Sequence, residues 1–343
     1  MDAALEKLLS LDGPSGFEGR VRGFLEEEFR KYADRVYTDG LGNLYAEKTG
    51  GKSRVMFCAH MDEVGFLVQH ITQTGFIRFI PLGGWDERIL PGIEVKILGE
   101  KEVYGVVSTK PPHITSEAER KKVMDFDELY VDAGLSSKEL VELGVEVGTP
   151  IVPASTLRVR GSVVKSKALD DRVGCYNLLR LLRQVHTGRD TPTIIFVATV
   201  QEEVGTRGAQ VVSNTQHADA ALILEATVAG DTPNVPDEKC PSKMGEGAVL
   251  TVMDKSMIAN QQIFRTLKML AENFGIKHQI KKPGFGGTDG GPLHLGGSGI
   301  PTGVISVPCR YIHTPNSYMN LSDVDEALKL AETFIHEFHP TTP

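Results

Sequence analysis

Residues 197–209 have the sequence VATVQEEVGTRGA, and this stretch decides the fold. A β-branched, apolar run from Thr193 to Val200 stops at two adjacent glutamates, Glu202 and Glu203. A glycine and a helical segment follow, as in a buried strand that turns into a helix at its carboxyl end. Two like charges there are costly unless a positive group neutralises them. The stretch therefore predicts a site at one edge of an α/β sheet.

Strands and helices alternate on both sides of this stretch. The apolar run Arg54–His60 predicts another buried strand, and further strands are expected to end at Glu225 and near Pro308. Helical spacing marks residues 17–33, 168–185, 258–275 and 322–338, the last with Ser322 as its expected cap. Strands separated by helices predict the α/β class, with a doubly wound, mostly parallel sheet and helices on both faces.

The pattern changes between about Phe66 and Arg160. Short alternating segments are separated by Gly- and Pro-containing turns, with one helix expected near Ser137–Leu143. This pattern of short alternating segments and turns is typical of a small all-β module. We therefore expect residues 1–65 and 162–343 to form an α/β domain and residues 66–161 to form an inserted all-β module.

Composition excludes several classes of protein. The 343 residues are 41% hydrophobic, enough for one large domain and a smaller one. A net charge of −8, without an extended basic cluster, argues against nucleic-acid binding. The N-terminus lacks the features of a signal peptide, and no apolar run approaches the length of a membrane span. The four cysteines form no C-x-x-C pair. We expect a cytoplasmic protein with no membrane or nucleic-acid partner.

Polar residues gather where the predicted strands end and where the 168–185 helix begins. In an open α/β sheet, the carboxyl ends of the strands form the ligand-binding edge. Imidazoles and several carboxylates at one edge are the ligand chemistry of zinc, cobalt or manganese. There are more acids than one tetrahedral ion needs, which favours two ions about 3.5–4 Å apart. The residues concerned are His60, Asp62, Asp170, Asp171, Glu202, Glu203, Glu225 and His313.

Six blocks carry a family resemblance: AHMDEVGF (59–66), KALDDRVG (167–174), VQEEVGTRGA (200–209), AGDTP (229–233), GGTDGG (286–291) and YIHTPNS (311–317). Together they resemble the cytoplasmic glutamyl/deblocking (TET-type) aminopeptidases. These are dinuclear metallopeptidases, and some members carry the label endoglucanase. Because GPSGFEGRVRGF (13–24) also fits, the resemblance covers essentially the whole chain.

The resemblance implies roles for individual residues. His60 and Glu225 are expected to bind the first metal, Asp170 to bridge both, and Glu203 and His313 to bind the second. Asp62 is expected to orient His60, and Glu202 to act as the general base. Position 225 departs from the family, which typically has aspartate there, and the extra methylene lengthens the reach by roughly 1.3–1.5 Å. Asn316 and Ser317 also depart from the pattern of many relatives.

The activity implied is a metal-dependent aminopeptidase that removes N-terminal residues from peptides. A bridging hydroxide would attack the scissile carbonyl, with a glutamate as the general base. The resemblance also implies that residues 1–65 and 162–343 are the catalytic domain and that residues 66–161 are a β-barrel used in assembly. The assembly it implies is a homo-oligomer, a dodecamer built from dimers. Residues 284–291, GFGGTDGG, are expected to line the pocket for the first side chain, and Arg310 is a candidate to favour acidic substrates. The metal and the preferred N-terminal residue stay open.

Three alternatives stay open as well. A metal-dependent deacylase would keep the metals but act on a non-peptide amide. An endoglucanase-type glycosidase would need two carboxylates about 5–10 Å apart across a sugar and no metal. Adjacent Glu202 and Glu203 on an extended segment point to opposite sides and fit that arrangement poorly. A scaffold protein that lost its site is disfavoured because the histidines and acids are retained.

Overall fold

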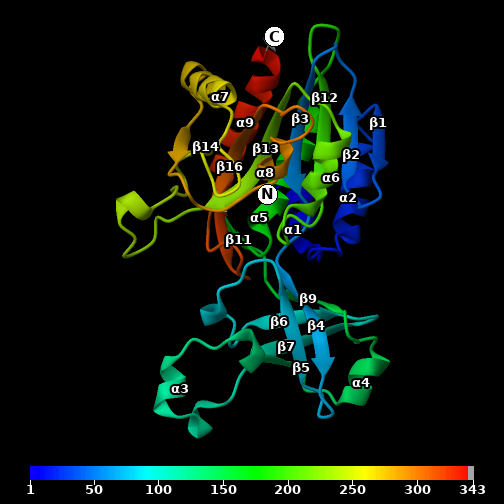
Figure 1. Ribbon diagram of the computed structural model, residues 1–343, viewed down its shortest axis with the longest axis vertical. Helices are drawn as coiled ribbons and strands as arrows, with labels where there is room; N and C mark the ends of the chain where they lie inside the picture. Colours follow the sequence, from blue (N-terminus) through cyan, green and yellow to red (C-terminus); the bar gives the residue numbers. More distant parts are fainter. Residues whose placement is uncertain (339–343) are drawn as a thin grey trace.

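The protein is described by a computed structural model that covers residues 1–338 (Figure 1). The last residues of the expected catalytic domain, 339–343, lie outside this range. Within it the chain forms a large sheet layered between helices and a separate closed β-barrel (Figure 1). This arrangement confirms the predicted α/β class with an additional barrel.

Eleven strands form the large sheet, in the order β1-β2-β12-β3-β13-β16-β17-β11-β10, with β14 joined to β16 and β15 joined to β14. Their bounds are β1 (Arg35–Thr38), β2 (Leu44–Lys48), β3 (Arg54–His60), β10 (Arg158–Arg160), β11 (Val163–Ser166), β12 (Thr193–Thr199), β13 (Ala220–Val228), β14 (Ala248–Thr251), β15 (His278–Lys281), β16 (Thr302–Arg310) and β17 (Ser317–Asn320). The neighbours β12, β3, β13 and β16 are parallel, whereas the strands at both flanks pair mostly antiparallel. The sheet is therefore mixed, and its predicted parallel character belongs to the four central strands.

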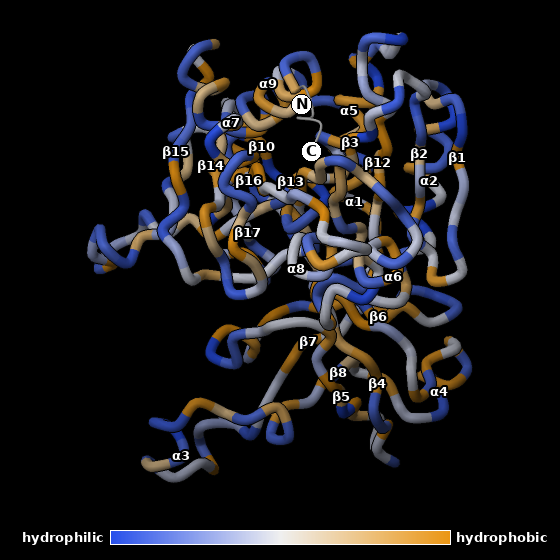
Figure 2. The backbone as a smooth tube through the Cα atoms, turned by 45° about the horizontal axis from the view of Figure 1, so that its top comes forward, coloured by the Kyte–Doolittle hydropathy of each residue, from blue (hydrophilic) through white to orange (hydrophobic). Residues whose placement is uncertain are grey.

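Side chains along the central strands alternate between two apolar cores, one on each face of the sheet. The backbone of β3 and β12 is accordingly coloured largely as hydrophobic in Figure 2. In β3, Phe57 and Ala59 enter the first core, while Met56 and Cys58 enter the second. The first core is covered by α1 (Ala3–Ser10), α2 (Gly19–Phe29), α5 (Leu169–Gln184), α7 (Gln261–Asn273) and α9 (Leu321–Glu337). The second is covered by α6 (Arg207–Thr215) and α8 (Gly290–Leu293). Helices on both faces confirm the doubly wound arrangement.

Most predicted helices appear with slightly different ends. The last helix is capped by Asn320, whose side chain accepts a hydrogen bond from the Ser322 amide at 3.1 Å, so the expected cap at Ser322 is wrong. Asn at this position satisfies one of the free amides of the first turn. In α5, Asp170 and Asp171 have non-helical φ and ψ angles, so regular helix begins after them.

Six antiparallel strands close the barrel in the order β4-β5-β8-β7-β6-β9. They are β4 (Gly65–Ile71), β5 (Ile77–Leu82), β6 (Glu94–Leu98), β7 (Glu102–Ser108), β8 (Tyr130–Asp132) and β9 (Pro150–Pro153), accompanied by α3 (Glu117–Lys121) and α4 (Ser137–Glu142). Their inward side chains form a third apolar core of their own. The strand Arg158–Arg160, which the sequence pattern groups with this module, instead pairs with β11 at the edge of the large sheet.

Buried charges join the two parts. Lys96 of β6 donates to Asp12 at 2.8 Å, and Asp12 also accepts from Lys167 at 2.9 Å. Lys167 in turn lies 2.7 Å from Glu63, at the start of the barrel. The pairing compensates charges that would be costly if buried alone.

Within residues 1–338, no helix combines the length and apolar character needed to cross a bilayer. The expected cytoplasmic location stays a prediction.

Candidate metal centre

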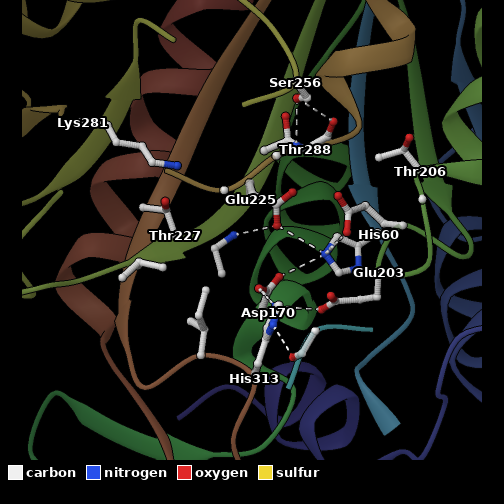
Figure 3. Close-up of a pocket in the computed structure, with 18 residues that line it drawn as sticks. His60, Asp170, Glu203, Thr206, Glu225, Thr227, Ser256, Lys281, Thr288 and His313 are labelled. Atoms are coloured by element: carbon white, nitrogen blue, oxygen red, sulfur yellow. Dashed lines mark hydrogen bonds and ion pairs between the residues drawn. The ribbon is translucent and has the colours of Figure 1, made fainter. Parts of the chain in front are cut away.

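Six predicted site residues surround one cavity of about 360 Å³ at the carboxyl edge of the central strands (Figure 3). They are His60, Asp170, Glu202, Glu203, Glu225 and His313. His60 ends β3, the two adjacent glutamates follow β12, and Glu225 lies within β13. Parallel neighbours deliver residues from distant parts of the chain to this edge, as the sequence predicts.

His60 is the centre of the cluster and is 2% exposed. Its Nε2 lies 3.0 Å from Asp170 Oδ1, 3.5 Å from Glu225 Oε1 and 3.9 Å from Glu202 Oε2. Its Nδ1 faces away from the cavity, 3.1 Å from the backbone oxygen of Asp62 and 3.3 Å from its Oδ1. Because both Asp62 oxygens can only accept, the ring donates through Nδ1, and Nε2 is the nitrogen that faces the acids of the cavity.

His313 forms the second half of the cluster. Its Nε2 lies 3.3 Å from Asp170 Oδ2 and 3.2 Å from Glu203 Oε1, and its Nδ1 donates to the Gly84 carbonyl at 2.9 Å. Asp170 thus faces one histidine with each carboxylate oxygen. This is the geometry of a carboxylate shared between two neighbouring sites.

Unusual backbone conformations aim these side chains. Gln201 and His313 adopt positive φ angles of 56° and 58°, which non-glycine residues rarely adopt. Because Asp170 and Asp171 have non-helical angles, their side chains separate. Asp170 enters the cavity, whereas Asp171 accepts hydrogen bonds from the amides of His60 and Gly174 at 3.2 and 2.9 Å.

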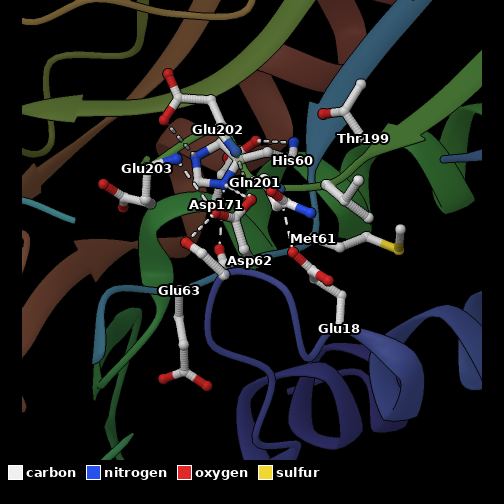
Figure 4. A network of polar contacts seen from close by, with 12 residues as sticks. Glu18, His60, Met61, Asp62, Glu63, Asp171, Thr199, Gln201, Glu202 and Glu203 are labelled. Carbon is white, nitrogen blue, oxygen red and sulfur yellow. Dashed lines mark hydrogen bonds and ion pairs between the residues drawn. The ribbon is translucent and has the colours of Figure 1, made fainter. Parts of the chain in front are cut away.

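A network behind the cavity holds the two adjacent glutamates (Figure 4). Asp62 Oδ1 accepts from the Glu202 amide at 3.0 Å, and its Oδ2 accepts from the Glu203 amide at 3.1 Å. Its Oδ2 also accepts from the Ser15 hydroxyl at 2.6 Å, and the Glu18 carboxylate accepts from the Gln201 amide at 3.1 Å. Asp62 therefore orients the glutamate pair as well as His60.

The acids of the cavity are too crowded to be ionised together without compensation. Burial, reinforced by neighbouring acids, raises the pKa of Glu202 and Glu203 and raises that of Glu225 to about 8. Burial also raises the pKa of Asp170, but hydrogen bonds from His313 and His60 outweigh it and lower the pKa overall. The site therefore needs added positive charge, either protons or cations.

The donor atoms fit divalent cations. Two groups of three ligand atoms each lie within 4.8 Å of one another, and His60 belongs to both: His60, Asp171 and Glu225, and His60, Asp170 and Glu203. Glu203 Oε1 is buried and, although it lies 3.2 Å from His313 Nε2, makes no hydrogen bond of normal geometry. Imidazole nitrogen and carboxylate oxygen are ligands of zinc, cobalt and manganese. A cation among them would satisfy an acceptor that otherwise lacks a partner.

Other residues of the site were missed or misassigned by the sequence. The expected glycine-rich loop does reach the cavity, through Gly286, Gly287 and Thr288. Lys281 also lines it, but neither its isolated position nor its type singled it out. Arg310 forms a two-bond ion pair with Asp231 and is not among the residues that line the cavity, so its expected place in the pocket wall is wrong.

Asp289 is a further buried acid that the sequence did not single out. It accepts a hydrogen bond from the Thr199 hydroxyl, while its second oxygen is buried without a partner. Burial raises its pKa to about 6. Its negative charge also raises the pKa of Glu202, so it adds to the crowding of acids at this edge.

The α/β layers and the cluster of imidazoles and carboxylates, together with the comparisons that follow, define the class of peptidases. Residues 42–330 match the model of the M42 glutamyl aminopeptidase family, and the chain belongs to this family. The lysyl aminopeptidase of Pyrococcus furiosus is 33% identical over 343 residues, covering 98% of this chain and 97% of the relative. These matches confirm the expected family.

Solved structures show the same fold over nearly the whole chain. The TET aminopeptidase of Thaumarchaeota archaeon SCGC AB-539-E09 has a TM-score of 0.93 and 37% identity, covering 98% and 95% of the two chains. The TET1 peptidase of Pyrococcus horikoshii, described as assembling into a tetrahedron or a large octahedral shell, has a TM-score of 0.86 and 32% identity, covering 98% and 99%. A Thermotoga maritima protein described as an endoglucanase has a TM-score of 0.79 and 34% identity, covering 96% of each chain.

We predict that Gly83→Ala lowers thermal stability and peptidase activity. Gly83 follows β5 at φ +86°, and an added Cβ would lie 2.7 Å from Val64 Cγ1 and 3.2 Å from Glu203 Cβ. The contact would displace Glu203 or the turn. Overpacking of this kind costs about 1–3 kcal/mol, measurable by thermal unfolding, and activity is measured on an aminoacyl-nitroanilide.

Gly92→Ala is the matched control, because Gly92 has nearly the same backbone angle, φ +93°, with nothing within 4 Å of an added Cβ. Both variants carry the strain of a non-glycine residue at positive φ, so their difference isolates the contact with Glu203 and Val64. Equal losses of stability and activity in the two variants would contradict the prediction.

Proposed function

We propose that this chain is a metal-dependent aminopeptidase that removes N-terminal residues from peptides. The observation that carries the proposal is the joint arrangement of two histidines and four carboxylates around one cavity, in a chain of the M42 family. Each histidine holds its Nδ1 on a backbone or carboxylate acceptor and turns Nε2 toward the acids. That arrangement favours cation binding over a purely structural cluster.

We assign the five predicted ligands to two divalent cations, Zn²⁺, Co²⁺ or Mn²⁺. His60 and Glu225 would hold the first, Glu203 and His313 the second, and Asp170 would bridge them. The separate approaches of Asp170 Oδ1 to His60 and of Oδ2 to His313 support the bridging role. When bound, such cations make a water molecule acidic and polarise a carbonyl group.

Glu202 is the proposed general base. Its carboxylate lines the cavity, and burial together with neighbouring acids raises its pKa, which suits a group that must accept and return a proton near neutral pH. It would take a proton from the attacking water and pass it to the leaving amine nitrogen. Asp62 acts as a positioning residue, because it holds the Glu202 amide and the His60 ring together.

The acidic cavity also explains selection for a free N-terminus. A protonated α-amine is attracted by the carboxylates, whereas an internal peptide segment brings no such charge. A deacylase acting on a non-peptide amide would use the same cations and base, and a preference for amides without a free α-amine would favour it.

We propose that residues 66–161 are an assembly domain and that the protein forms a dodecamer built from dimers. The P. horikoshii relative described as a tetrahedral or octahedral assembly supports this proposal. The barrel part also exposes apolar side chains, with Val141 62% and Val147 68% exposed. Exposed apolar groups of this kind favour contacts with another chain.

We predict that chelation abolishes hydrolysis of aminoacyl-nitroanilides and that Zn²⁺, Co²⁺ or Mn²⁺ restores it, because the cavity acids need cations. Metal content is measured by mass spectrometry alongside activity, with Mg²⁺ as a comparison ion. Full activity in a metal-stripped sample would contradict the proposal. Cleavage of a β-glucan by that stripped sample would favour the glycosidase instead.

We predict that Glu202→Gln lowers kcat by about 10²- to 10⁴-fold, because the amide cannot accept the proton. Bound metal should stay close to the wild-type amount. Its neighbour Glu203 gives the matched comparison, since Glu203→Gln should lose metal as well as activity. Loss of metal in Glu202→Gln, or unchanged activity of that variant, would contradict the assignment of Glu202 as the general base.

We predict a solution mass of about twelve subunits by multi-angle light scattering, independent of dilution over the working range. Replacing Val141 and Val147 together by lysine should reduce the mass, because charge opposes burial of these side chains. A monomeric wild-type protein is incompatible with the proposed assembly.

A further inference from the structure

Glu202 and Glu203 lie on a segment that runs from the end of β12 into the first turn of α6 (Figure 4). We call this segment, residues 200–208, the glutamate loop. Its two ends meet, because the Gly208 amide donates to the Val200 carbonyl at 3.0 Å. The proposed general base and one proposed metal ligand thus share a closed loop. The positions of their carboxylates depend on the groups that hold its ends.

The backbone of the glutamate loop needs support from outside. Gln201 and Thr206 adopt positive φ angles of 56° and 51°. Non-glycine residues rarely adopt such angles, and surrounding contacts must enforce them. Asp62 supports the middle of the loop by accepting from the Glu202 and Glu203 amides. The two ends, next to the residues with positive φ, need a partner of their own.

Asn43 supplies that partner through its side-chain amide. It ends the turn between β1 and β2 and is fully buried. Its Oδ1 accepts a hydrogen bond from the Val200 amide, and its Nδ2 donates to the Gly208 carbonyl, both at 3.1 Å. One amide group therefore contacts the first and the last residue of the glutamate loop.

Asp39 fixes the orientation of this amide. Its Oδ2 accepts from Asn43 Nδ2 at 2.8 Å. Its Oδ1 accepts from the backbone amides of Leu41, Gly42 and Asn43 at 2.9–3.0 Å, which anchors the carboxylate in the turn. If the Asn43 amide were flipped, its oxygen would face the oxygens of Asp39 and Gly208, and no hydrogen bond would form. The turn thus presents the amide in the one orientation that joins both ends of the loop.

Gly208 makes room for this contact. A Cβ added at Gly208 would lie 2.4 Å from Asn43 Oδ1 and 2.7 Å from the Val200 nitrogen. Both atoms belong to the hydrogen bond between Asn43 and Val200, so a larger residue at position 208 would push that bond apart. The glycine lets the amide approach both ends of the loop closely.

We infer that Asn43 is a positioning residue of the peptidase reaction, which holds the two ends of the glutamate loop and thereby sets the place of the Glu202 carboxylate. The inference rests on the proposed function and deepens it with a residue outside the cavity. Asn43 is not among the described residues that line the cavity, so its effect on the reaction passes through the loop. Displacing a reacting group by about 1 Å can slow a reaction about 10²-fold.

We predict that Asn43→Ala lowers kcat for an aminoacyl-nitroanilide by about 10- to 100-fold, while KM changes by less than about threefold. The loop that carries the base loses its support, whereas the other cavity walls keep theirs. Kinetics are measured at saturating Zn²⁺, Co²⁺ or Mn²⁺, so that weaker binding at Glu203 does not limit the rate. Asn43→Asp should also lose activity, because it keeps an acceptor for the Val200 amide but has no donor for Gly208.

Asn177→Ala is the matched control. Asn177 is also buried, at 1% exposure, but it lies in α5 and its Nδ2 donates to the Val324 carbonyl at 3.4 Å. Its loss removes a buried amide of the same size without touching the glutamate loop. Thermal stability should fall in both alanine variants, whereas kcat should fall in Asn43→Ala alone.

A double-mutant cycle with Glu202→Gln shows whether Asn43 acts through the base. In the Glu202→Gln background, Asn43→Ala should lower kcat by less than about threefold, because the group that it positions is already inactive. A fluorogenic aminoacyl-coumarin amide gives the sensitivity that this slow background needs. Asn43→Ala would not act through Glu202 if it caused the same fold-loss in both backgrounds, and the inference would then be wrong.

Hydrogen exchange tests the support of the loop independently of activity. The Val200 amide should exchange about tenfold faster in Asn43→Ala than in the wild type, because its acceptor is gone. Asn177→Ala should leave that rate unchanged. Unchanged protection of Val200 in Asn43→Ala would show that Asn43 does not hold the loop.

Other outcomes overturn the inference as well. Wild-type kcat in Asn43→Ala does so, and so does an equal loss of kcat in Asn177→Ala. If Asn43→Ala fails to fold, wild-type kcat in Asn43→Asp has the same consequence. Failure of the metal-loaded wild type to cleave any aminoacyl-nitroanilide would instead overturn the proposed function itself.

Discussion

The interaction on which the structure depends is the crowding of buried acids around one imidazole. Three carboxylate oxygens lie 3.0–3.9 Å from His60 Nε2, and each comes from a different part of the chain. Acids at such distances repel one another unless positive charge stands among them. Hydrogen bonds behind the cavity hold the segments that carry these side chains, because Asp62 accepts from the Glu202 amide and Asp171 accepts from the His60 amide. The fold thus holds like charges together at a site where the proposed cations would balance them.

Support for the cluster comes from a second set of charges directly behind it. Arg172 is fully buried and donates to the Met61, Leu8 and Leu11 carbonyls at 2.8, 2.8 and 2.9 Å, and its guanidinium lies 3.3 Å from Glu63. Glu63 follows His60 by three residues, and Arg172 follows Asp170 by two. Pairing the two segments behind the site therefore fixes the spacing of the ligands in front of it. Removing Arg172 or Glu63 would leave its buried partners without a hydrogen bond or ion pair. The free-energy cost of such unpaired buried groups exceeds that of never having buried them.

The sequence alone predicts a site residue well where a local pattern determines the place of that residue in the fold. Apolar runs that end in acids or histidine identify strand ends, and parallel strands bring those ends to one edge, so His60, Glu203 and Glu225 are predictable. Asp170 at the start of the 168–185 helix and His313 after the strand that ends near Pro308 are candidates on the same grounds, and the family resemblance adds the role of each residue. Lys281 carried no such signal, because an isolated lysine in a short strand is ordinary until its neighbours in space are known. Arg310 shows the converse: a basic residue near the site was suggestive, yet Asp231 neutralises it. Contacts of this kind depend on side-chain packing that no periodicity encodes.

The barrel has an apolar core of its own, but the turn after its strand β5 also contacts the site. The Gly84 carbonyl, just beyond β5, accepts from His313 Nδ1 at 2.9 Å and so sets which nitrogen faces Asp170 and Glu203. Gly83 approaches Glu203 so closely that a Cβ there would contact it. Trp85 ties the same turn to the start of β4 by donating to the Gly65 carbonyl at 3.0 Å. The inserted strands thus supply the outer support for one histidine and one glutamate, whereas the N-terminal Ser15 supports Asp62 from the other side. A sheet edge can gather ligands from its own strands, but here their orientation is completed by segments that the sheet does not contain.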